Sequence, residues 1–242
     1  MEWSGEGIVL GTRAHGETSA ILEVMTPDRG RHMGLVRGGR SRRHQAMLQA
    51  GNTLALTWRA RLESHLGLFT VEPLVSRAAR LIDAPAGVLG LQTIAAHLRY
   101  LPERDPHPGL YEALSIILDH MDDAIGAARL LVRFELALLD ELGFGLDLSK
   151  CAANGQTHDL AWVSPKTGRA VSREAGLPYA PKLLALPVFL SEREADVSVD
   201  DLQAALQLTG YFLIRHLAEP RGQPLSPARD QFLGRLRVVP AA

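Results

Sequence analysis

The segment "TLALTWRAR", residues 53–61, alternates between two kinds of side chain along its length. Leu54, Leu56 and Trp58 take every second position, and threonine, alanine and arginine stand between them. A period of two is typical of a β-strand with one buried face, because successive side chains of a strand point to opposite sides. The segment therefore predicts a strand that packs one face against an apolar core.

Four further runs rich in valine, isoleucine, leucine and threonine accompany this segment within the first 75 residues. They are "GIVLGTR" at 7–13, "TSAILEVMT" at 18–26, "HMGLVRG" at 32–38 and "LGLFTVEPLV" at 66–75. Glycine, proline and aspartate separate the runs, as they do between strands. Five short strands predict a small barrel, and an OB-fold is a five-stranded barrel of this kind.

Helical spacing replaces the alternation beyond about residue 81. In "AARLLVRFELALLDELG", residues 127–143, apolar side chains recur at intervals of three and four, and Gly143 predicts the end of the helix. Further apolar runs at 88–101, 109–121 and 202–217 predict more helices. Helix starts are predicted by a capping pair and by a serine–proline step, at Ser198 with Asp201 and at Ser226 with Pro227.

A polar, turn-rich stretch at about 149–181 interrupts the helical half, and we expect it to form small β pieces or loop. The fold class predicted is therefore α+β with more than one domain. We expect residues 1–80 to form an OB-fold domain, and residues 81–242 to form a helical domain that carries the polar insert.

Composition narrows the class of protein further. Of 242 residues, 46% are hydrophobic and 22% charged, which is ordinary for a globular protein with its own core. Cys151 is the single cysteine, so an intrachain disulfide is excluded and a reducing compartment is favoured. The N-terminus lacks a basic, apolar leader and no run approaches 18 apolar residues, so we expect neither a signal peptide nor a membrane span.

Positive charge gathers in one place although the net charge of the chain is −1. "GRHMGLVRGGRSRRHQAM", residues 30–47, holds five arginines, two histidines and no acidic residue. Arginine binds phosphate through two parallel hydrogen bonds, and glycines let a backbone approach a ligand closely. The DNA-binding candidates are Arg29, Arg31, Arg37, Arg40, Arg42 and Arg43. A loop that serves only solubility is the alternative interpretation.

Two details of this stretch follow from strand geometry. Alternation along "RHMGLVR" places Arg31 on one face with Met33 and Leu35, so the strand projects only some of its arginines. The loop after the strand is expected to carry the others as a mobile, positive rim. Contacts to several phosphates predict binding that is sensitive to salt and largely independent of sequence.

The sequence contains none of the catalytic or phosphate-binding motifs considered below. The phosphate loop and the nucleophile elbow are both missing, and "GFG" at 143–145 follows a helix rather than a strand. Cys151 and His158 lack the second pair of ligands that a structural zinc site needs. We therefore expect no enzyme activity, no catalytic residue, no cofactor and no metal site.

Several collinear stretches resemble the RecO family of bacterial recombination mediators, which act in the RecF pathway. They lie at 6–42, 48–61, 132–155 and 162–176 and together cover nearly the whole chain. The resemblance implies a non-enzymatic, cytoplasmic and nucleoid-associated protein that binds single- and double-stranded DNA and anneals complementary strands. It also implies that the protein, together with RecR, helps RecA load onto DNA coated by single-strand-binding protein (SSB).

The resemblance carries individual residues as well. It assigns DNA binding to Arg31, Arg37, Arg40, Arg42 and Arg43, and it assigns Arg133, on the helix "VRFELALL", to the acidic tail of SSB. Arg129 lies four residues earlier and so shares its helix face, although two ordinary surface arginines would look the same. An adaptor that acts mainly through the SSB tail or RecR is the alternative function.

One departure from the family concerns metal. Many members carry four zinc ligands in the insert, whereas this chain keeps Cys151 alone. We therefore regard the insert as a degenerate zinc-finger-like element that hydrogen bonds and packing hold together.

Overall fold

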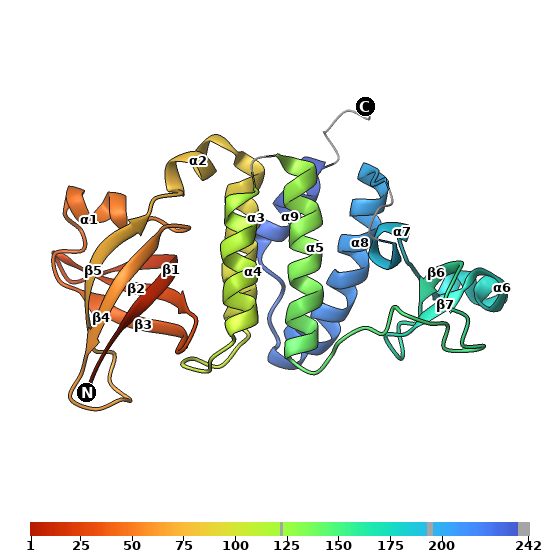
Figure 1. Ribbon diagram of the computed structural model, residues 1–242, viewed down its shortest axis with the longest axis horizontal. Coiled ribbons are helices and arrows are strands. Elements are labelled where there is room, and N and C mark those ends of the chain that lie inside the picture. The colour runs from red at the N-terminus through yellow and green to blue at the C-terminus, as the bar shows by residue number, and fades with distance from the viewer. Residues whose placement is uncertain (122, 193–195, 237–242) are drawn as a thin grey trace. The chain divides into compact units, whose positions relative to one another are not determined.

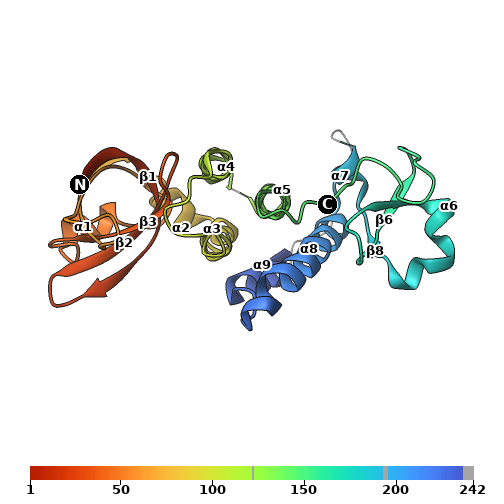
Figure 2. The same ribbon diagram turned by 90° about the horizontal axis from the view of Figure 1, so that it is seen from below.

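The computed structural model describes residues 1–121, 123–192 and 196–236. The chain forms two compact units, Met1–Asp123 and Ala124–Ala242, which are drawn in Figures 1 and 2. Each unit builds its own core, so each is described by itself. No helix within the described ranges is long and apolar enough to cross a bilayer.

Five strands of the first unit close into a barrel in the order β1-β2-β3-β5-β4. All neighbours pair antiparallel except β3 and β5, which run parallel and pair only at Leu35 and Leu68. The bounds are Glu2–His15 (β1), Ser19–Thr26 (β2), Gly30–Val36 (β3), Thr53–Arg59 (β4) and Leu68–Val75 (β5). The predicted OB-like barrel is thus confirmed, with a strand in each of the five expected runs.

The barrel core follows the predicted alternation. Leu54, Leu56 and Trp58 of β4 are at most 2% exposed and pack with apolar side chains of the other strands. On β3, Gly34 faces inward because a Cβ there would lie 2.4 Å from Cδ2 of Phe69. Arg31 is on the outer, half-buried face of β3, as its position in the alternation predicts.

Four helices belong to the first unit: α1 (Arg42–Met47), α2 (Ala78–Asp83), α3 (Pro85–Leu98) and α4 (Pro108–Asp119). Helix α3 contacts β1, and α4 contacts β2. The compact unit therefore continues past residue 80 and takes in the first helices that follow the barrel. The domain boundary at residue 80 stays a prediction.

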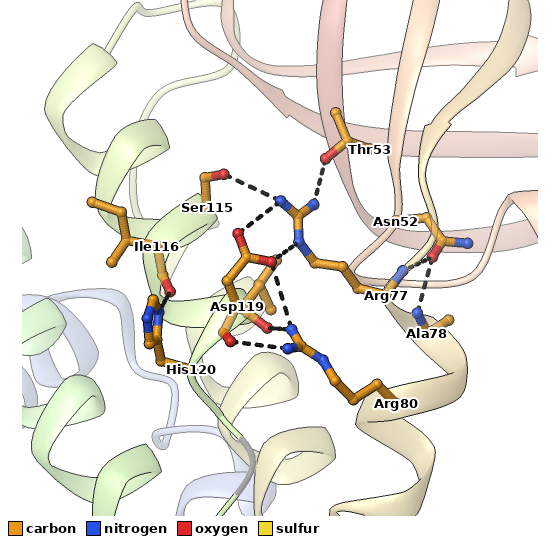
Figure 3. A network of polar contacts seen from close by, with 10 residues as sticks. Asn52, Thr53, Arg77, Ala78, Arg80, Ser115, Ile116, Asp119 and His120 are labelled. Carbon is orange, nitrogen blue, oxygen red and sulfur yellow. Dashed lines mark hydrogen bonds and ion pairs between the residues drawn. The ribbon is translucent and has the colours of Figure 1, made fainter.

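Arg77 links the end of the barrel to α4 (Figure 3). Its guanidinium, 7% exposed, donates to Asp119 Oδ1 at 2.6 Å and to Thr53 Oγ1 at 2.7 Å. The hydrogen bond from Arg77 lowers the pKa of the Asp119 carboxyl from its ordinary value. A charge pair with one largely buried partner therefore fastens this helix to the strands.

Asn52 forms the second part of the same network (Figure 3). Its Oδ1 accepts from the backbone N–H groups of Arg77, at 2.8 Å, and Ala78, at 3.0 Å. Its Nδ2 donates to the carbonyls of Ala46 and Met47, near the end of α1. This buried amide therefore satisfies backbone groups at a helix start and a helix end, where intrahelical partners are lacking.

The second unit combines three long helices with the polar insert. The helices are α5 (Ala124–Glu141), α8 (Val199–Leu213) and α9 (Pro227–Leu236). Both predicted starts are confirmed: Ser198 and Asp201 form a reciprocal capping box, and α9 begins at Pro227.

The insert forms a three-stranded sheet, β7-β6-β8, with the bounds Leu160–Val163 (β6), Ala170–Ser172 (β7) and Leu184–Ala185 (β8). Short turns complete the unit: α6 (Arg173–Gly176), η1 (Leu177–Lys182), α7 (Val188–Ser191), η2 (Ile214–Ala218) and η3 (Glu219–Arg221).

A buried ion pair joins the three long helices. Arg229 of α9 donates to Glu135 of α5 through two nitrogens, Nε to Oε1 at 2.7 Å and Nη2 to Oε2 at 2.9 Å. The Thr209 hydroxyl of α8 also donates to Glu135. Burial lowers the pKa of Arg229, but the carboxylate of Glu135 more than compensates and raises it. The pair satisfies the charge of two side chains that are at most 5% exposed.

Cys151 is buried at the start of the insert. Its Sγ accepts from the backbone N–H of Ala153 at 3.4 Å, and Asn154 Nδ2 donates to Ser172 Oγ at 3.5 Å. Burial raises the pKa of the thiol, but hydrogen bonds from Ser172 and from the backbone of Asn154 and Ala153 together outweigh burial and lower the pKa to about 7. His158 is exposed, and no three metal-ligating side chains gather anywhere in the described parts of the chain. This arrangement of Cys151 and His158 does not show that the insert is a zinc finger.

Candidate nucleic-acid interface

The six candidate arginines divide into two groups along β3. Arg29 lies in the turn before the strand and Arg31 at its start, whereas Arg37, Arg40, Arg42 and Arg43 follow its end. The seven residues of β3 span about 23 Å at ~3.3 Å per residue. The basic stretch is therefore two separate clusters at opposite ends of one strand, rather than a single patch.

Backbone hydrogen bonds fix the loop that follows β3. Gly38 has a φ of +66°, which is suited to glycine, and Gly39 packs so closely that a Cβ would lie 2.8 Å from Cβ of Ala20. The N–H of Arg40 donates to the carbonyl of Thr18 at 3.0 Å. The loop is thus attached to the β1–β2 connection and differs from the mobile rim that the sequence suggested.

Arg40 points its guanidinium toward the protein backbone. Nη1 donates to the carbonyls of Gly16, at 3.0 Å, and Glu17, at 2.8 Å. These two residues lie in the β1–β2 turn, so Arg40 joins that turn to the loop after β3. The geometry gives this arginine a structural task, whereas its contact with DNA stays a prediction.

Arg42 and Arg43 belong to the short helix α1 and not to a loop, which corrects the sequence interpretation. Ser41 begins the helix as its N-cap by accepting from the N–H of His44. The turn forms because this cap and the Asn52 amide satisfy backbone groups at its two ends. Both arginines are exposed, and neither makes an ion pair within the described residues.

A groove of about 310 Å³ lies beside this helix, where β3 and β5 close the barrel. Arg37, His44 and Arg59 line it together with apolar side chains of β3 and β5. Arg59 was not among the sequence candidates. The signal was present, because Arg59 follows Trp58 in the alternation of β4 and so points outward. Its exposed guanidinium lies 2.8 Å from the carboxylate of Glu2.

Arg31 is largely neutralised within the first unit. Its Nη1 lies 3.0 Å from Oε1 of Glu23, and both side chains are only 12% exposed. Arg99 of the turn after α3 donates to the same carboxylate at 2.7 Å. One buried anion therefore holds two cations, and this pairing weakens the case for Arg31 as a phosphate contact.

Replacing Glu23 by glutamine is expected to raise the affinity for DNA. The change releases Arg31 and Arg99 from their shared anion, and one added phosphate contact steepens the dependence of log affinity on log salt by about 0.7–0.9. Fluorescence anisotropy with a labelled oligonucleotide across ~50 to ~200 mM salt measures both quantities. Glu112→Gln, at an exposed position of α4, changes the net charge equally. Equal effects of the two variants would contradict a specific role of the Glu23 pairing.

The two arginines assigned to a protein partner lie on α5 of the second unit. Arg133 is exposed and Arg129 is half-buried. They are four residues apart and so share one face of the helix, while Phe134 and Leu138 pack into the core. Within the described ranges neither arginine forms an ion pair. Their assignment to an acidic peptide stays a prediction.

Comparison with known proteins covers both units. Two family models match, "Recombination protein O N terminal" over residues 1–77 and "Recombination protein O C terminal" over residues 91–224. The protein called DNA repair protein RecO from Mesorhizobium japonicum is 61% identical over 239 residues, which are 98% of this chain and 94% of that protein. Its namesake from Brucella abortus is 59% identical over 234 residues, 96% of this chain and 95% of the relative.

Proposed function

The chain belongs to the RecO family of DNA repair proteins, and from this premise we propose that it binds single- and double-stranded DNA and anneals complementary strands. A role in DNA repair and recombination follows from the family. The finer activity is the mediator function: with RecR, the protein helps RecA load onto single-stranded DNA that SSB covers.

The observation that supports DNA binding most directly is the exposed arginine cluster beside the barrel groove. Arg37, Arg42 and Arg43 are exposed and, among the described residues, have no acidic partner. Phosphate groups are the partners that such guanidinium groups bind best. Because the cluster contacts backbone phosphates rather than base edges, the binding is independent of sequence, as an annealing protein requires.

Annealing needs no covalent chemistry from the protein. Base pairing and stacking release about 1.4 kcal/mol per base-pair step, so complementary strands anneal downhill once they are brought together. The protein lowers the electrostatic repulsion between two polyanions and holds them close. This proposed role is non-enzymatic and requires neither a catalytic residue nor a cofactor.

We further propose that Arg133, with Arg129, contacts the acidic tail of SSB. The support is an exposed guanidinium beside a second one on the same helix face, which suits the carboxylates of a peptide. DNA would then occupy the barrel while SSB is held by the second unit. A protein that acts mainly as an adaptor for SSB or RecR is the alternative.

The test is an annealing assay on complementary oligonucleotides, naked or coated with SSB, with and without RecR. The protein is expected to accelerate annealing in both settings. Arg133→Ala should keep its rate on naked strands and lose about tenfold on SSB-coated strands, because a charge-assisted contact is worth ~1.5 kcal/mol. Arg235→Ala, an exposed arginine of α9, serves as the matched control.

Each unexpected outcome has a definite meaning. Failure to anneal naked strands overturns the annealing proposal, and activity confined to SSB-coated strands favours the adaptor. Equal rates for Arg133→Ala and Arg235→Ala on coated strands would show that the α5 assignment is wrong.

A further inference from the structure

A second cavity of the first unit, of about 380 Å³, adjoins the groove beside α1, because Glu2 in its lining lies 2.8 Å from Arg59 of that groove. It is formed by the start of β1, the β2–β3 turn, strands β3 and β4, the connection from β4 to β5, and the connection from α3 to α4. Its lining residues include Trp3, Arg29, His32, Trp58 and Arg104. The size is at the lower end of small-molecule sites, which are typically about 300–1,000 Å³.

Aromatic rings form one wall of this cavity. Trp3 and Trp58 stack with their ring centroids 6.2 Å apart at an interplanar angle of 22°. His32 meets both rings edge-on, at 5.2 Å from Trp3 and 5.1 Å from Trp58. Trp58 is 1% exposed and donates from Nε1 to the carbonyl of Leu66, whereas Trp3 is only half-buried. Trp3 is thus the ring of this wall that can accept another flat group.

Two guanidinium groups complete the site. That of Arg29 lies 5.8 Å from the ring centroid of Trp3, and that of Arg104 lies 5.7 Å from the ring of Trp58. Arg104 also donates to the carbonyls of Glu63 and His65, so it is fixed in place. Arg29 is exposed and makes no ion pair within the described residues, so it is able to rotate over a ligand.

The polar groups favour a neutral ligand with both donors and acceptors. Burial and the charge of Arg104 lower the pKa of His32 to about 4, so its ring is neutral at pH 7. The Nδ1–H of His32 donates to the carbonyl of Met33, which leaves Nε2 as the acceptor of the ring. Carboxylates line the cavity as well, from Glu2, Asp28 and Glu63, and oppose its arginines. An isolated phosphate is therefore a poorer ligand here than a flat, neutral heterocycle.

We propose that this cavity accepts an unpaired nucleobase of single-stranded DNA, stacked on Trp3 beneath Arg29. The inference rests on the DNA binding proposed above and gives that binding a preference for single strands. A base in a duplex is paired and stacked, so it cannot enter the cavity without being extruded. The α1 cluster, which consists of Arg37 and of Arg42 and Arg43 in α1, in contrast contacts phosphates that both forms of DNA present.

The distance between the two sites suits one continuous strand. They are adjacent, since Trp58 of the cavity and Arg59 of the groove are consecutive residues of β4. An OB-fold typically covers about 4–16 nucleotides, so one strand can reach both sites. Phosphates would then follow the arginines while a single base is held in the aromatic cavity.

The experiment compares the full chain with Trp3→Ala and Trp3→Phe on three probes of ~16 nucleotides. The probes are a single-stranded oligonucleotide, a blunt duplex, and an abasic strand with the same phosphates. Trp3→Ala is expected to weaken binding of the normal single strand about tenfold, since one stacked base contributes ~1–3 kcal/mol. Binding of the duplex and of the abasic strand should stay unchanged, and Trp3→Phe should retain most of the affinity.

Leu62→Ala is the matched control, because Leu62 is an exposed apolar side chain of the same β4–β5 connection outside the lining. A second measurement covers the case in which Trp3→Ala does not fold. Single-stranded DNA should quench the tryptophan emission of the unaltered chain and should quench that of Trp3→Phe less.

The outcomes separate this site from the proposed function. If the unaltered chain binds DNA but discriminates neither normal from abasic strands nor single strands from duplex, the nucleobase site is overturned alone. Equal affinity of Trp3→Ala and the unaltered chain for single strands would overturn it as well. If the unaltered chain binds no DNA at all, the proposed function and this inference both fail.

Discussion

Replacing Arg37, Arg42 and Arg43 together by alanine is expected to weaken DNA binding about a hundredfold near ~0.1 M salt. Each of the three exposed charge pairs with phosphate contributes roughly 1 kcal/mol to binding. Their combined loss corresponds to a decrease in affinity of about a hundredfold. The affinities for single-stranded and for duplex DNA should fall to a similar degree, because the three side chains contact backbone phosphates, which both forms of DNA present.

The salt dependence is the sharper readout of this variant. Each lost phosphate contact removes about 0.7–0.9 from the slope of log affinity against log salt, so three contacts remove about 2–3. The control replaces three exposed arginines of the second unit, Arg173, Arg221 and Arg235, and so removes the same total charge. Equal changes of slope in both triple variants would contradict the assignment of the α1 cluster.

Replacing Arg229 by alanine is expected to lower the free energy of unfolding by about 3–5 kcal/mol. The physical reason is the carboxylate of Glu135, which is fully buried and would lose the cation that balances its charge. The backbone around the pair also depends on the guanidinium, which lies against Gly210 of α8. Urea unfolding followed by circular dichroism measures the loss, and hydrogen exchange should locate it in α5, α8 and α9.

The double variant Glu135→Leu/Arg229→Met is the informative control for this pair. It removes both charges and fills the space with apolar atoms, so its stability should lie close to that of the unaltered chain or above it. If the double variant is as unstable as Arg229→Ala, then packing rather than the unpaired charge causes the loss. That result would contradict the argument from burial.

Local patterns made the barrel predictable. The alternation of Leu54, Leu56 and Trp58 fixes which face of β4 is buried, and a shift by one residue would expose all three. The capping box at Ser198 and Asp201 also depends on residues three apart, so it can be recognised in the sequence alone. Features of this kind are determined within a few residues of the chain.

Charge pairing was not predictable in the same way. In the sequence Arg31 counts as one more positive charge, but the fold brings it to Glu23 and adds Arg99 from 76 residues away. Glu135 and Arg229 are separated by 94 residues and meet only because three helices pack together. The aromatic cavity is a further example, since Trp3 and Trp58 come from β1 and β4, which are distant in the sequence but pair side by side in the barrel.

Strands β3 and β5 pair only at Leu35 and Leu68, in parallel, so a seam runs between these two strands of the barrel. Opening this seam breaks far fewer backbone hydrogen bonds than separating any antiparallel pair of strands in the sheet. A strand of DNA in the groove, which Arg37 after β3 and Leu68 of β5 both line, would contact both sides of the seam and hold them together. Binding at that point then adds to the folding stability of the barrel, because a ligand that requires the closed form shifts the equilibrium toward it.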